Sequence, residues 1–225
     1  MMKHKHALYP MIVSLIAFVC FAVVLVLFAS TVQPLWGRML LLIVPALVLG
    51  VVAWLAAKGK LGKSATIIWT TVLTVVLLLL SAFYVVVLYV WAATTTTTDV
   101  RYYSRAYHQI DDRDGVEDVF PASVPADAEE VSFIYHPQFL QGGEVFELSY
   151  TTTDEKLTQW KRMLREEAEW IGTNKEWEKD NGWFCDEDDG VLYQLSWDGG
   201  FYHGEICYVL INEETGCIKF YYSHW

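Results

Sequence analysis

Three long stretches without a charged residue fill most of the first 98 residues of this 225-residue chain. Two of them, residues 11–29 and 39–57, are each 19 residues long, and the third is most apolar over about residues 66–93. A bilayer core of about 30 Å is crossed by about 20 helical residues. Because backbone groups in lipid must hydrogen-bond internally, we expect each stretch to be a transmembrane helix despite its many Val and Ile residues.

The charges of the chain divide sharply after residue 98. The first 98 residues carry six Lys/Arg and no acidic residue, whereas residues 99–225 carry ten Lys/Arg and all 27 acids, a formal charge of −17. This division excludes one ordinary soluble domain, and the acidic half argues against nucleic acid as a partner. The sequence therefore predicts a membrane domain (1–98), a juxtamembrane linker (99–129) and an acidic domain (130–225).

The lysines near the spans predict the orientation. Five lysines lie before the first span or between the second and third, whereas the first loop carries only Arg38. Cytoplasmic loops are enriched in Lys and Arg, so we expect a cytoplasmic N-terminus. With three spans, the acidic domain then lies outside the cell membrane. A cleaved signal peptide is the alternative for the first span, but its apolar run is longer than usual for one.

The spans lack the intramembrane charges that mark transport pathways and proton relays. Small residues recur at helical spacing in the second span, at Ala46, Gly50, Ala53 and Ala57. Such a face permits close helix contact. It either packs against the other two spans or docks a second membrane protein. Pro45 in the same span predicts a kink.

The acidic domain shows alternating and helical patterns that predict an α+β fold. Alternation predicts strands at residues 130–136, 144–152, 191–197, 204–211 and 217–222. Leu157, Trp160, Leu164, Ala168 and Ile171 recur at helical spacing, and Gly172 ends the expected helix. The order β-β-α-β-β-β favours an antiparallel sheet with one packed helix, carried on a three-helix membrane anchor.

The last of these segments resembles a known family. Residues 208–222, YVLINEETGCIKFYY, are similar to the closing strand–turn–strand of PepSY-type domains, small modules found outside bacterial membranes. The whole chain is also similar to multi-span proteins of Gram-positive bacteria. These resemblances imply a location and carry no functional residue to this chain.

Three cysteines lie in the acidic domain, where disulfides persist if the domain is extracytoplasmic. The NEETG turn is expected to place Cys217 opposite Ile211 and Cys207 opposite Tyr221, so these two cysteines do not face each other. Cys185–Cys217 is then the favoured bridge, and three reduced thiols are the alternative. No CxxC motif indicates redox catalysis.

Metal binding and catalysis have little support in the sequence. The adjacent acids Asp186, Glu187, Asp188 and Asp189 form a weak Ca²⁺ candidate, with a solvated acidic loop as the alternative. His203 and Glu205 share a strand face without the further ligands that zinc needs. The nucleophile motifs GxSxG, SxxK and HExxH do not occur. We therefore expect no cofactor and no chemistry from this chain.

Aromatic residues in two turns are the best binding candidates. Trp177, Trp183 and Phe184 lie in the 19-residue stretch from Gly172 to Gly190, which reads as a loop, and Phe201 and Tyr202 lie at a hairpin tip. Long loops in compact domains are often functional, and exposed aromatics bind ligands and partners well. The alternative is that the loop folds back to cover the sheet.

The expected function is a sensing, binding or accessory role for an extracytoplasmic domain on a membrane anchor. Its partners are the lipid bilayer and either another membrane protein or an envelope ligand. Two alternatives come from other classes: a cell-envelope enzyme with an unrecognised site, and an accessory subunit of a transporter or channel.

Overall fold

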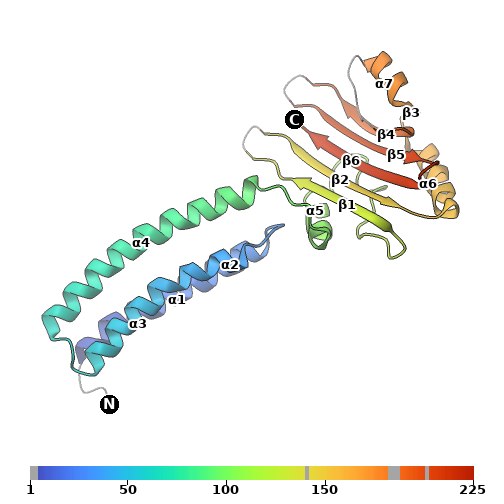
Figure 1. Ribbon diagram of the computed structural model, residues 1–225. Helices are drawn as coiled ribbons and strands as arrows, with labels where there is room; N and C mark the ends of the chain where they lie inside the picture. The colour runs from blue at the N-terminus through green and yellow to red at the C-terminus, as the bar shows by residue number, and fades with distance from the viewer. Residues whose placement is uncertain (1–4, 140–141, 182–187, 201–202) are drawn as a thin grey trace. The chain divides into compact units, whose positions relative to one another are not determined.

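The computed structural model describes residues 5–139, 142–181, 188–200 and 203–225 (Figure 1). The chain forms two compact units, Met1–Ala92 and Ala93–Trp225, called here the N-terminal unit and the C-terminal unit. Helices build the N-terminal unit. The C-terminal unit combines helices with a six-stranded antiparallel sheet, which confirms the predicted α+β class.

Three apolar helical segments form the N-terminal unit. The first joins η1 (Lys5–Ala7) to α1 (Leu8–Ala29), the second runs through α2 (Trp36–Met39), η2 (Leu40–Ile43) and α3 (Val44–Ala57), and the third is α4 (Lys63–Thr94). All three are long and apolar enough to cross a membrane, as predicted. Where a kink was expected, the tighter η2 turn precedes Pro45 in the first turn of α3, because proline donates no backbone N–H.

Apolar packing joins α4 to the other two segments near its C-terminal end. The buried side chains of this cluster are Phe21, Phe28, Met39, Leu42 and Leu88. Beside them, the Arg38 guanidinium lies 3.3 Å from the centroid of the Trp91 ring. The Tyr84 hydroxyl donates to the Arg38 carbonyl oxygen at 3.0 Å. The loop between the first two segments is therefore tied to α4 by both polar and apolar contacts.

The sheet of the C-terminal unit has the strand order β1-β2-β6-β5-β4-β3. Its strands are β1 (Glu129–His136), β2 (Glu144–Thr151), β3 (Trp170–Thr173), β4 (Val191–Asp198), β5 (Glu205–Asn212) and β6 (Cys217–His224). All neighbouring strands are antiparallel, and β6 pairs with β2 on one side and β5 on the other. The strand latest in the chain therefore occupies the middle of the sheet.

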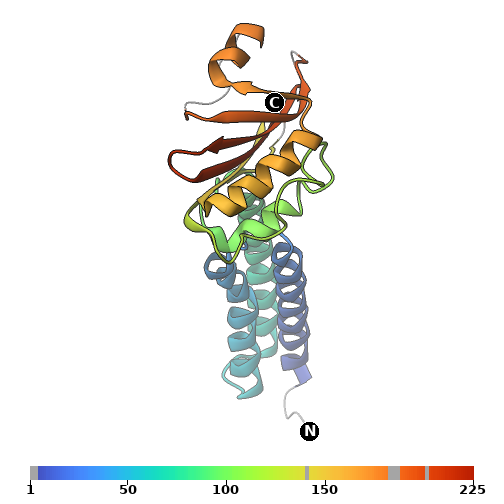
Figure 2. The same cartoon turned by 90° about the vertical axis from the view of Figure 1, so that its right-hand side faces the viewer.

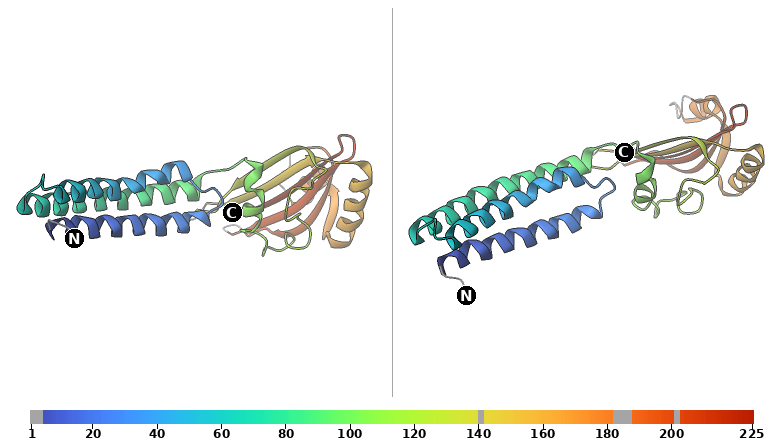
Figure 3. Two further views of the ribbon diagram at one scale, coloured as in Figure 1. Left: turned by 90° about the horizontal axis from the view of Figure 1, so that it is seen from below. Right: turned by 60° about the horizontal axis from the view of Figure 1, so that its bottom comes forward.

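One face of the sheet forms the main core of this unit. The helices α5 (Tyr103–Tyr107) and α6 (Asp154–Glu167) lie on this face together with the loop of residues 108–121 (Figures 2 and 3). From α6, Leu157 and Leu164 are buried, and the Trp160 ring lies 5.1 Å from the ring of Phe220 in β6. The apolar stripe of the predicted helix therefore packs on the sheet as expected.

Residues 108–121, called here the docking loop, belong to this core. Ile110, Val116 and Phe120 are buried, and the Phe120 ring lies 5.4 Å from that of Phe220. Gly115 has a φ of +77°, and a Cβ there would lie 2.7 Å from the Cβ of Leu195. Glycine is therefore required at position 115 for the docking loop to approach β4 this closely.

The element order differs from the prediction between residues 168 and 181. Helix α6 ends at Glu167 because Ala168 adopts extended backbone with φ −74° and ψ 134°. The expected continuation of the helix to residue 171 is wrong, since Trp170–Thr173 form β3 at the sheet edge and a short helix, α7 (Asn174–Asn181), follows. Pairing with β4 outweighs the helical spacing of Ile171.

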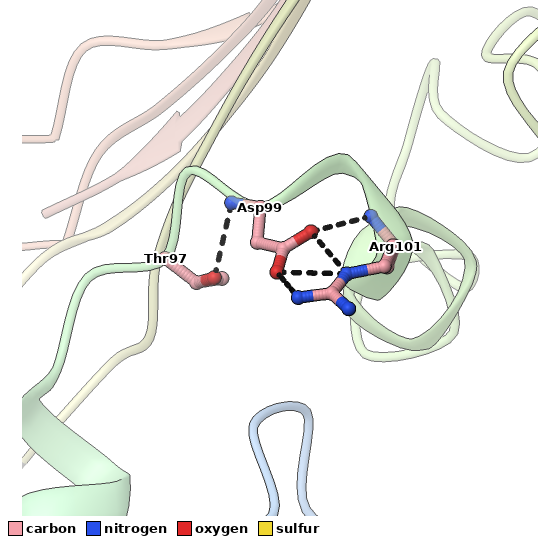
Figure 4. A network of polar contacts seen from close by, with 3 residues as sticks. All are labelled: Thr97, Asp99 and Arg101. Atoms are coloured by element: carbon pink, nitrogen blue, oxygen red, sulfur yellow. Dashed lines mark hydrogen bonds and ion pairs between the residues drawn. The ribbon is translucent and has the colours of Figure 1, made fainter.

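The chain enters the C-terminal unit through a hydrogen-bonded turn. Thr97 and Tyr135 of β1 exchange backbone hydrogen bonds of 2.9 Å in both directions. The Asp99 carboxylate accepts from the Arg101 backbone N–H at 3.0 Å and from Arg101 Nη2 at 2.6 Å (Figure 4). The segment after α4 is therefore held on the edge strand of the sheet.

Candidate functional site

The sheet face opposite the docking loop carries a cluster of aromatic side chains, called here the aromatic face. Its buried members are Trp177, Leu192, Ile206, Tyr208 and Leu210, and its half-buried members are Trp170, Trp197, Tyr221 and Trp225. They come from β3, β4, β5, β6, α7 and the residue after β6. In Figure 3, right, α7 lies on the other side of the sheet from the docking loop.

The rings of the aromatic face contact one another edge to face. Trp177 lies at the centre, with ring centroids 5.3 Å from Trp170 and 5.6 Å from Trp197, both near perpendicular. Trp197 continues the chain to Trp225 at 5.7 Å. Perpendicular ring pairs add to the stability that burial alone supplies. The half-buried rings are thus fixed in place by the buried one.

Acidic groups border the aromatic face. Glu169, exposed beside Trp170, accepts from the buried Gln194 side chain at 3.0 Å. Asp198, exposed beside Trp197, accepts from the Gly200 backbone N–H at 3.1 Å. On the same face the Lys219 ammonium forms an ion pair with Asp188. Fixed aromatic rings with carboxylates at their edges suit a cationic group.

A β-bulge places Trp197 on this face. Leu195 is an extra residue in β4, because Gln194 pairs with Tyr208 while Ser196 pairs with Cys207. The expectation that Trp197 shares a face with Val191 and Leu195 is therefore wrong. A bulge shifts the alternation by one residue, and all later side chains change face.

The predicted contact residues have different outcomes. Trp177 is 1% exposed in α7, which corrects its expected position in an exposed loop. Trp183, Phe184, Phe201 and Tyr202 lie outside the described residues, so their contacts stay a prediction. The half-buried rings at positions 170, 197, 221 and 225 were missed. Alternation within each strand is the signal that finds such residues once the bulge and β3 are known.

The acidic cluster is described only in part. Asp186 and Glu187 lie outside the described residues. The Asp188 carboxylate pairs with Lys219, its carbonyl oxygen accepts from Asn174 Nδ2 at 2.7 Å, and Asp189 is exposed. Within the described residues, no three His, Cys, Asp or Glu side chains are grouped closely enough to hold a metal ion.

The cysteines of the C-terminal unit occupy unlike environments. Cys217, half-buried, begins β6 opposite Thr151 and Asn212, whereas Cys185 lies outside the described residues, so the expected bridge stays a prediction. Cys207 is reduced and buried, and its burial raises the pKa of the thiol. Cys207 lies opposite Tyr222, one residue beyond the expected Tyr221.

His203 and Glu205 lie at the β4–β5 end of the sheet. The exposed His203 ring lies 6.5 Å from that of His224, nearly parallel to it, and Glu205 is half-buried opposite His224. The described residues bring neither a nucleophile nor a metal-ligand set to this pair. The pair therefore supplies no assembled chemistry by itself.

The small-residue face of the second span contacts α1. Ala46 and Ala53 are buried, Gly50 is half-buried and Ala57 is exposed. The Ser14 hydroxyl of α1 donates to the Ala46 carbonyl oxygen at 2.8 Å. A Cβ at Gly50 would lie 3.5 Å from Ser14 Oγ. Small side chains thus bring α1 and α3 together, as a packing face within the chain does.

A cavity of about 470 Å³ lies between α1, α4 and the second segment. Its lining is apolar apart from Cys20, Thr74 and Ser81, and the Thr74 hydroxyl donates to the Thr70 carbonyl oxygen at 2.6 Å. The lining carries no charged side chain. This cavity therefore offers volume for hydrocarbon and no ion pathway.

Comparison with known protein families, curated proteins and solved structures finds no match for this chain. The argument for function consequently depends on the geometry of the aromatic face and on the three apolar helices.

Proposed function

We propose that this chain is a multi-pass membrane protein that presents its C-terminal unit outside the cytoplasm as a binding, sensing or accessory domain. Its contact surface is the aromatic face, and its partner offers a basic segment rich in Arg or Lys. The supporting observation is the set of four half-buried aromatic rings gathered around the buried Trp177.

Composition and charge both favour a basic partner. Trp and Tyr dominate the energy of protein interfaces because they bury large areas at low conformational cost. Arg and Lys are attracted to the faces of such rings, and Arg most often. The unit carries a formal charge of −17, with Glu169 and Asp198 beside two of the rings. This field attracts cations and repels anionic ligands.

Binding is tested with the full chain in nanodiscs of uncharged lipid. The probes are a fluorescent Arg-rich peptide and an acidic peptide of equal length. Trp170→Ala and Trp197→Ala alter the aromatic face without altering charge, and Thr158→Ala, on the exposed side of α6, is the matched control.

We expect the Arg-rich peptide to bind in a salt-sensitive manner. Each Trp variant weakens binding about tenfold or more, as truncation of an interface tryptophan does. The control variant binds like the unaltered chain. Equal affinity in all variants, or preference for the acidic peptide, contradicts the proposal.

Orientation is tested by labelling with a membrane-impermeant maleimide. Thr158→Cys and Lys60→Cys are placed separately in a chain whose four natural cysteines are replaced, because both positions are exposed. We expect labelling at position 158 in intact cells and at position 60 only after permeabilisation. The reverse pattern places the C-terminal unit in the cytoplasm and contradicts the proposal.

A further inference from the structure

The carboxyl group of Glu144, the first residue of β2, lies inside the core. The residue is 4% exposed. Its Oε1 accepts a hydrogen bond of 2.8 Å from the Tyr135 hydroxyl. The nearest cation is Arg113 of the docking loop, whose Nη2 lies 4.0 Å from Oε2, beyond hydrogen-bond distance. The charge of an ionised Glu144 is therefore incompletely compensated.

Other polar groups surround Glu144 from every packed element. They are Tyr135 of β1, Asp112 and Arg113 of the docking loop, Glu205 and Cys207 of β5, and Tyr222 and His224 of β6. Arg113 and His224 favour ionisation of Glu144, whereas Asp112 opposes it. Arg113 Nε and the Tyr222 hydroxyl are buried and hydrogen-bond to no described atom. Two groups able to stabilise the carboxylate are thus left unused beside it.

The docking loop that carries Arg113 also covers Cys207. A Cβ at Gly115 would lie 3.3 Å from Cys207 Sγ, and Cys207 is 0% exposed. The Ser196 hydroxyl donates to the Asp114 carbonyl oxygen at 3.2 Å. Movement of the loop away from the sheet would therefore admit solvent to both Glu144 and Cys207.

We propose that the proton on Glu144 controls the docking loop: the neutral carboxyl keeps the loop closed on the sheet, and ionisation favours an open state. In the open state the carboxylate reaches water and Cys207 becomes accessible. This regulation acts on the face opposite the aromatic face and does not depend on the proposed function.

The direction follows from burial. Because burial favours the uncharged form, it raises the pKa of Glu144 in the closed state. The closed state therefore holds the proton more tightly than an open state with a solvated carboxyl. Raising the pH from the ordinary glutamate range through the raised pKa shifts the loop towards the open state. Arg113 reduces this shift without cancelling it.

The test uses the full chain in nanodiscs, with Cys20, Cys185 and Cys217 replaced by Ala. The reaction of Cys207 with dithiodipyridine is measured from pH 4 to pH 8. Each rate is divided by that of the same chain in denaturant, which removes the intrinsic pH dependence of the thiol. The variants are Glu144→Gln, Arg113→Gln and, as matched control, Glu117→Gln, an exposed acid of the same loop.

We expect the normalised rate to rise about tenfold or more with pH in the parent chain and in the Glu117 variant. Glu144→Gln keeps the low rate throughout, because its side chain stays uncharged. Arg113→Gln moves the rise to higher pH. A rate that ignores pH, or that rises equally in Glu144→Gln, overturns the proposal. A faster reaction in Glu144→Gln also overturns it, since the ion pair would then hold the loop closed.

Hydrogen exchange on the unaltered chain gives a measurement that needs no folded variant. The amides of Val116 and Phe120 donate within the docking loop. We expect their protection factors, corrected for intrinsic exchange, to fall with rising pH while those of β5 stay constant. Constant protection in the loop contradicts the proposal.

Discussion

Gly115→Ala tests the docking loop through steric overlap. The residue has a φ of +77°, a left-handed conformation that costs a residue with a Cβ about 1–2 kcal/mol. The added methyl group would lie 2.7 Å from the Leu195 Cβ and 3.3 Å from Cys207 Sγ. Overpacking of a core costs about 1–3 kcal/mol more. The substitution should lower the free energy of unfolding by about 2–5 kcal/mol.

Gly216→Ala is the matched control for Gly115→Ala. Its φ is +71°, but its Cβ would meet only the Thr152 carbonyl oxygen, at 3.2 Å. We expect a loss of about 1–2 kcal/mol from backbone strain. Urea unfolding of the full chain in nanodiscs, followed by tryptophan fluorescence, measures both losses. The difference between them isolates the overlap with β4.

The double variant Gly115→Ala, Leu195→Ala completes this test. Truncating Leu195 leaves space for the new methyl group, so the two losses should add to more than the loss measured in the double variant. An equal cost for Gly115→Ala and Gly216→Ala, together with simple additivity, would refute the close contact between the docking loop and β4.

Three further predictions concern other parts of the molecule. Trp177→Ala should cost about 3–5 kcal/mol in urea unfolding because the side chain is fully buried, with a smaller loss for the half-buried Trp170→Ala as its comparison. Gly50→Leu should separate α1 from α3 and lower resistance to unfolding in SDS, whereas Gly50→Ala, with its Cβ 3.5 Å from Ser14 Oγ, should be tolerated. Because the pKa of Glu144 is raised on folding, its contribution to stability is complete below the ordinary glutamate pKa and is lost as the pH rises through the folded value. Glu144→Gln should remove that part of the pH dependence in unfolding measured from pH 4 to pH 8; an unaltered slope would show that Glu144 is not its source.

The membrane helices could be predicted because lipid leaves the backbone little choice. Residues 11–29, 39–57 and 66–93 have no soluble alternative at that length and hydropathy. The hairpin between β5 and β6 was also predictable, but its register was not. Asn212 accepts from the backbone N–H groups of Glu214 and Thr215, which widens the turn and pairs Asn212 with Cys217. One residue of turn geometry therefore displaced each expected partner.

Long-range contacts account for the remaining errors. Nothing local distinguishes Trp170 and Ile171 from the end of a helix, because only pairing with β4 makes them a strand. Trp177 looks like an exposed loop residue among polar neighbours until α7 packs on the sheet. Glu144 begins an alternating strand and looks solvated, since Arg113 lies 31 positions earlier and meets it only in the folded unit.

The central position of β6 has a consequence for biosynthesis. While the ribosome is still producing the chain, β1 and β2 can form a hairpin, and β3, β4 and β5 can pair in turn. The two groups remain separate until residues up to His224 have emerged, because β6 alone bridges β2 and β5. Until then both groups expose an unpaired edge of the kind that recruits other strands. A nascent C-terminal unit therefore depends on protection from aggregation for longer than a sheet whose neighbours follow chain order.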